Sequence, residues 1–95
     1  MNPHQLCLDA LRGFIERADR GELAQAQAAI IQFALGFPDL KARSDAMAEL
    51  QRSLAEDAGS RPPGSSQAAY HAVVDAMIDR TREAVLDTKA TQPSA

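Results

Sequence analysis

Alanine is the feature that most constrains this chain, because it fills 19 of the 95 positions. Alanine favours helices and contributes little apolar area to a core. Without it, 24 larger apolar side chains remain, and only 4% of the residues are aromatic. β-branched residues, which favour strands, are also few. The composition therefore predicts an all-α fold with a thin core.

A thin core has consequences for how the chain is stabilised. A domain of this length buries only roughly 60–65% of its unfolded surface, and small domains often rely on disulfides, a metal or a partner chain. A single cysteine, Cys7, excludes an internal disulfide. We therefore expect one domain that associates with itself or with another protein.

Four segments show apolar residues at the spacings of three and four that are typical of one helix face. They span about residues 3–19, 22–36, 39–57 and 66–88. Together they predict a small four-helix bundle, in which the first two helices form a tight hairpin and the third is a surface helix.

The long fourth helix follows a stretch rich in proline and glycine. This organisation predicts a single helical domain over residues 1–88, an internal flexible linker at 57–65 and a disordered tail at 89–95.

Residues that start and stop helices lie near the predicted boundaries. Asn2, Asp39 and Ser66 are suited to N-cap positions, and Pro3 to the first helical position. Gly21 follows the first apolar stripe, so we expect it to end that helix with a positive φ.

The second segment is apolar nearly all round. One stripe is followed by Leu23, Ala26, Ile30, Ala34 and Phe37, while Ile31, Phe33 and Leu35 fall outside it. A helix of this kind is usually buried on several sides. We therefore expect it at the centre of the fold or of a subunit contact.

The spacing of Gly21, Leu23, Ala26, Ile30 and Pro38 resembles the second helix of a tetratricopeptide repeat. The tryptophan, leucine and glycine of the first repeat helix are absent, and no second copy follows. An ordinary antiparallel helical hairpin is the simpler interpretation.

The fourth helix, at about 35 Å, is longer than the second, at about 22 Å. The apolar surfaces of these two helices exceed what four such helices need to cover, so a partner is expected to cover the excess. The predicted apolar anchors for that partner are Phe33, Phe37, Tyr70 and Val74.

Acidic residues recur at every fourth position of the fourth helix, at Asp75, Asp79, Glu83 and Asp87. Like charges at this spacing destabilise a helix by a few tenths of a kcal/mol per pair, about as much as opposite charges stabilise it. Nearby Arg80, Arg82 and Lys89 could compensate. Alternatively, Asp75, Asp79 and Glu83 form the acidic rim of the partner-binding surface.

Several functional classes lack their sequence signals. No nucleophile elbow, HExxH motif or phosphate-binding glycine loop is present, so no catalytic residue, cofactor or small-molecule substrate is expected. His4 with Cys7, and His71 with Asp75, share helix faces but match no fixed metal motif. No metal site is expected either.

The net charge of −3 makes nucleic-acid binding an unfavoured interpretation. Arg12, Arg17 and Arg20 nevertheless cluster near the first turn and could contact phosphates. A small DNA-binding transcriptional regulator is therefore kept as the alternative.

No apolar segment is long enough to cross a membrane, no export signal is visible, and a lone cysteine suits a reducing compartment. The expected location is the cytoplasm. The leading hypothesis is a non-catalytic interaction protein of adaptor, chaperone, immunity or antitoxin type. It would act through apolar helix faces, as a homodimer or with another protein.

Overall fold

The computed structural model describes the backbone of residues 2–91 and the side chains of residues 2–84. Within these residues it contains the helices α1 (Pro3–Arg17), α2 (Leu23–Leu35), α3 (Leu40–Ala58) and α4 (Ser66–Thr91), and one 3₁₀ turn, η1 (Arg20–Glu22). No strand forms in the described part of the chain. The prediction of an all-α four-helix bundle is confirmed.

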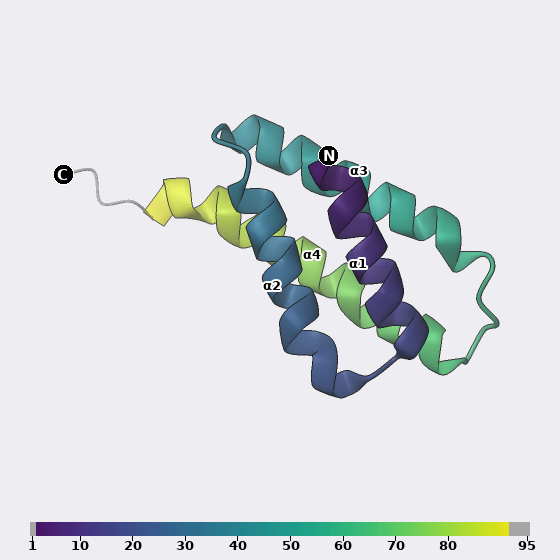
Figure 1. Ribbon diagram of the computed structural model, residues 1–95. Helices are drawn as coiled ribbons and strands as arrows, with labels where there is room; N and C mark the ends of the chain where they lie inside the picture. The colour runs from purple at the N-terminus through teal and green to yellow at the C-terminus, as the bar shows by residue number, and fades with distance from the viewer. Residues whose placement is uncertain (1, 92–95) are drawn as a thin grey trace.

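The helices form two antiparallel pairs, each joined by a short connection. α1 and α2 lie side by side, and α3 and α4 make the second pair, with α4 running behind α1 and α2 in Figure 1. Each helix contacts the other three. The predicted hairpin of the first two helices is therefore present.

The start of α1 agrees with the sequence. Asn2 is the N-cap, and its side-chain oxygen accepts a hydrogen bond from the backbone N–H of His4 at 3.0 Å. Pro3 takes the first helical position, where a missing N–H costs no hydrogen bond.

The end of α1 differs from the prediction, because Ala18 and not Gly21 ends the helix. Ala18 has φ 52° and ψ 35°, and its N–H bonds to the carbonyl of Phe14 at 2.9 Å. The next residue, Asp19, accepts a bond from the N–H of Gly21 at 2.9 Å and so caps η1. The first helix therefore ends before Gly21, because Asp19 already caps the 3₁₀ turn that contains Gly21.

The caps of the later helices also differ in detail. Asp39 occupies the N-cap position of α3, but its side chain makes no capping hydrogen bond. Ser65, and not Ser66, caps α4, since its hydroxyl accepts from the N–H of Ala68 at 3.1 Å. The two serines are adjacent and chemically alike, so the sequence alone could not separate them.

The segment between α3 and α4 is shorter than predicted, because residues 57 and 58 still belong to α3. Its remaining residues form hydrogen-bonded turns: the N–H of Ser60 bonds to the carbonyl of Asp57 at 3.1 Å, and the N–H of Ser65 to that of Pro62 at 3.1 Å. Gly64 takes a φ of 80°, which a glycine adopts without strain.

The tail was predicted to begin at residue 89, but the α4 backbone remains helical to Thr91. Residues 92–95 lie outside the described part of the chain.

One apolar core joins all four helices. Its fully buried members include Leu11 and Ile15 from α1, Ile30 from α2, Leu50 from α3 and Ile78 from α4. α3 buries Met47, Leu50 and Leu54 on a single side, as expected for a surface helix.

Within the single chain α2 is buried on one side only, so the expectation that it lies at the centre of the fold is wrong. Its alternative place, at the centre of a subunit contact, stays a prediction. Its buried residues, Ala26, Ile30, Phe33 and Ala34, lie on one face. The alanines made the pattern seem apolar in every direction, although alanine is a weak signal of burial.

The long apolar stripe of α4 is covered within the single chain, from Tyr70 to Thr81. Ala84, three residues beyond Thr81, is exposed. The side chain of Val85 lies outside the described residues. Over residues 66–84, α4 therefore leaves no large apolar side chain for a partner to cover.

Candidate functional site

The candidate site is the outward side of α2. Ala24, Ala28, Ile31 and Leu35, which we call the α2 face, are all exposed, with Ile31 at 40% and Leu35 at 59%. Spacings of four, three and four place them on one side of the helix. No charged residue occurs anywhere from Leu23 to Pro38. A solvent-facing helix normally carries charged residues on its outer side, so this one is unusual.

A shallow groove between α1 and α2 lies on another side of α2 and shares no residue with the α2 face. Leu6 of α1, 51% exposed, lines it together with Pro3, and α2 contributes Gln32 and Phe33. Its volume is about 270 Å³. The exposed large apolar side chains in the described part of the chain are Leu6, Ile31 and Leu35, so all of them belong to this hairpin.

A second groove lies at the end of the hairpin, around two of the predicted anchors. Phe33 and Phe37 meet edge to face with ring centroids 5.3 Å apart, and His4 lies 6.2 Å from the Phe33 ring. These three residues line a groove of about 270 Å³ with Glu49 of α3. The Nε2 atom of His4 is buried and has no hydrogen-bond partner among the described residues.

The structure places three of the four predicted anchors in the core. Phe33 is 7% exposed, Tyr70 4% and Val74 0%. Phe37 is half-buried and packs against the core. The choice of Phe33, Tyr70 and Val74 as anchors was incorrect, because neighbouring helices of the same chain cover their side chains.

The residues that are exposed were visible in the sequence as exceptions. Ile31, Phe33 and Leu35 fall outside the apolar stripe predicted for α2, and we took this as a sign of burial on several sides. Leu6 precedes the buried pair Cys7 and Leu8 and carries no signal of its own. Phe33, the third residue outside the stripe, is buried, so a position off the stripe does not by itself identify an exposed residue.

The predicted acidic rim takes part in packing between helices. The side-chain amide of Gln51 on α3 donates to Asp75 Oδ1 at 3.1 Å and to Asp79 Oδ1 at 2.9 Å. Glu83 is exposed. A neutral donor from α3 therefore helps to accommodate the close acids, a compensation that the sequence did not reveal. The side chain of Asp87 lies outside the described residues.

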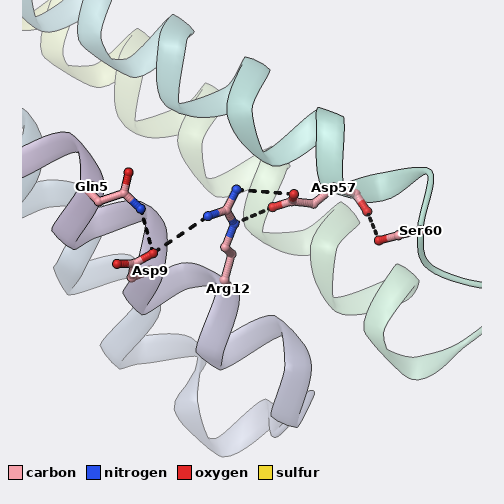
Figure 2. Close-up of polar contacts among 5 residues, drawn as sticks. All are labelled: Gln5, Asp9, Arg12, Asp57 and Ser60. Atoms are coloured by element: carbon pink, nitrogen blue, oxygen red, sulfur yellow. Dashed lines mark hydrogen bonds and ion pairs between the residues drawn. The ribbon is translucent and has the colours of Figure 1, made fainter.

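A polar cluster joins α1 to the end of α3 (Figure 2). Arg12 Nε lies 2.6 Å from Asp57 Oδ2, and Arg12 Nη2 lies 3.3 Å from Asp57 Oδ1, while Asp9 is 3.8 Å from the same guanidinium. The hydrogen bond to Asp57 raises the pKa of Arg12 above its ordinary value. The cluster borders a hollow of about 440 Å³ that Arg61 and Glu16 also line.

The arginines of the DNA-binding alternative are largely engaged with acids. Besides the pair of Arg12 with Asp57, Arg17 Nε lies 2.8 Å from Glu22 Oε1. These pairs offset the charge of two of the three arginines at close range. They lower the positive potential that contact with phosphates requires.

Burial shifts the pKa values of Cys7 and His71. Burial raises the pKa of the Cys7 thiol to about 11, which keeps it a thiol at neutral pH. Burial, and then the charge of Arg61, lowers the pKa of His71. Among the described side chains, no group of three or more His, Cys, Asp or Glu lies close enough to hold a metal ion.

None of the described helices is long and apolar enough to cross a membrane. The chain matches no protein-family model, and no curated protein or solved structure is significantly similar to it. Its function must therefore be argued from its own surface.

Proposed function

We propose that this protein is a non-catalytic protein–protein interaction module whose binding surface is the α2 face. The observation that carries the proposal is the combination of exposed Ile31 and Leu35 with a stretch from Leu23 to Pro38 that has no charge. Grouped exposed apolar residues commonly mark contacts between proteins.

The chemistry of the face defines its partner. A face without charged groups offers no electrostatic recognition, so the complementary surface is also apolar and uncharged. The residues of the α2 face form a row along one side of the helix. Such a row fits a second helix whose contact residues recur at the spacing of successive turns. The partner is thus an uncharged apolar helix face.

Site-specific photocrosslinking in the cell that makes the protein tests this function. A photoreactive amino acid replaces Leu35 in one variant and the exposed Ala55 of α3 in a control. We expect one discrete adduct from position 35, mapped to an apolar helix of the captured chain, and none of it from position 55. Equal adducts at both positions, or none at position 35, would refute the proposal.

A further inference from the structure

The small and large residues of the α2 face are placed symmetrically about the middle of the helix. The two small members of this face, Ala24 and Ala28, occupy the first half of the helix, and its two large members, Ile31 and Leu35, occupy the second half. Ala24 and Leu35 lie at equal distances on either side of the point between Ala29 and Ile30, and so do Ala28 and Ile31. Reversing the helix therefore exchanges small positions with large ones.

From this pattern we infer that the partner is a second copy of this chain, paired through α2 in antiparallel orientation about a twofold axis. This inference rests on the proposed function. In that arrangement Leu35 of one protomer meets the Ala24 position of the other, and Ile31 meets the Ala28 position. Large side chains then fill the space left by small ones, which allows the helix axes to approach to about 8–10 Å.

Parallel pairing would not give this fit. In a parallel pair each position faces the same position of the second copy. Alanine would then meet alanine, isoleucine would meet isoleucine and leucine would meet leucine. The result is a gap at one end of the contact and crowding at the other, and both are destabilising.

Electrostatics favours the same face. Each chain carries a net charge of −3, so two copies repel each other at long range. α1, α3 and α4 all carry acidic residues, whereas α2 carries no charged residue from Leu23 to Leu35. Pairing through α2 brings no charged groups of that helix together. The antiparallel orientation also sets the two helix dipoles in opposition.

The size of the face sets the expected strength. α2 has 13 residues, which corresponds to a length of about 20 Å. One such helix offers less than the roughly 800 Å² per partner of a typical stable interface. A reversible dimer with a dissociation constant in the micromolar range is expected.

Sedimentation velocity over a range from about 1 to about 500 µM measures this equilibrium. We expect a shift from monomer to dimer with concentration. Leu35→Glu should raise the dissociation constant at least about tenfold, because it places two buried charges in the pair. Ala55→Glu, an equally charged change on the exposed side of α3, should leave it unchanged.

Disulfide trapping tests the orientation. In a Cys7→Ser background, one protein carries Ala24→Cys and a second carries Leu35→Cys. Antiparallel pairing predicts that mixing them under mild oxidation yields mainly the heterodimer, since the two positions face each other across the axis. A predominance of self-linked Ala24→Cys dimers would overturn the orientation. Circular dichroism of each variant confirms that it is folded.

The outcomes separate the two proposals. A monomer at every concentration, with a different protein crosslinked at position 35, refutes self-pairing and supports the interaction function. A monomer with no crosslink at position 35 refutes both. A dimer that is insensitive to Leu35→Glu refutes the assignment of the α2 face.

Discussion

Arg12 on α1 donates two hydrogen bonds to the carboxylate of Asp57 at the end of α3, with Nε 2.6 Å from Oδ2 and Nη2 3.3 Å from Oδ1 (Figure 2). Their side chains are 40% and 27% exposed. The pair connects residues 45 positions apart in sequence. It therefore holds the C-terminal end of α3 against α1.

Removing this pair should measurably weaken the fold. We expect Arg12→Met to lower the free energy of unfolding by about 1 kcal/mol, as for a partly exposed ion pair with good geometry. A double-mutant cycle with Asp57→Asn, followed by urea denaturation, measures the coupling. The control is Lys41 with Asp45, an ion pair within α3 whose side chains are both exposed, which should couple by less than about 0.5 kcal/mol. Equal couplings would contradict the tertiary role of Arg12.

Gln51 bridges two acids of α4, which leads to a second prediction. Gln51→Glu should destabilise the protein by about 1–2 kcal/mol, because it removes the amide donor and adds a third carboxylate beside Asp75 and Asp79. Thermal unfolding at low and high salt measures the effect, and salt should reduce it. The same change at the exposed Gln25 of α2 should have little effect. A loss that is independent of salt would argue against charge as its cause.

The left-handed conformation of Ala18 gives a third prediction. At φ 52° an alanine is strained, and glycine is not. Ala18→Gly should therefore stabilise the protein by about 0.5 kcal/mol, after allowance for a more flexible unfolded chain and a lost methyl contact. Ala55→Gly, in the regular part of α3, should destabilise it by about 1 kcal/mol. Urea denaturation of both variants decides the matter, and a loss at position 18 would contradict the assignment.

His71 makes the stability depend on pH. Its folded pKa is lowered, first by burial and then by the charge of Arg61. Below about pH 6.5 an unfolded histidine takes up a proton while the folded one stays neutral. The unfolded state then binds more protons, so the free energy of unfolding should fall as the pH drops from about 6.5 towards the folded pKa.

The variant His71→Gln isolates this contribution, because glutamine does not titrate. Urea denaturation at about pH 7.5 and about pH 5 should show a smaller loss in the variant than in the natural chain. High salt screens Arg61 but does not relieve burial, so it should restore only part of the lost stability. Identical losses in both proteins would contradict the role of His71.

The sequence predicted the helices well and the surface poorly. Helix periods are local, so Asn2 and the apolar stripe of the first segment predicted α1 without any tertiary information. Whether Phe33 or Leu35 faces water depends on how α2 is rotated against its neighbours, which periodicity determines only when one stripe is clearly dominant. The alanines of α2 removed that dominance. Gln51, whose partners lie on another helix, left no local trace at all.

The position of α4 in both the fold and the chain affects how the protein is made. α4 contacts the other three helices, yet it is the last of the four to be synthesised. Until it emerges from the ribosome, α2 and α3 lack the part of their cover that α4 supplies. Translation of its residues takes on the order of seconds, whereas small helical bundles fold in microseconds to milliseconds. The ribosome, rather than the folding reaction, therefore sets the time at which the native protein appears.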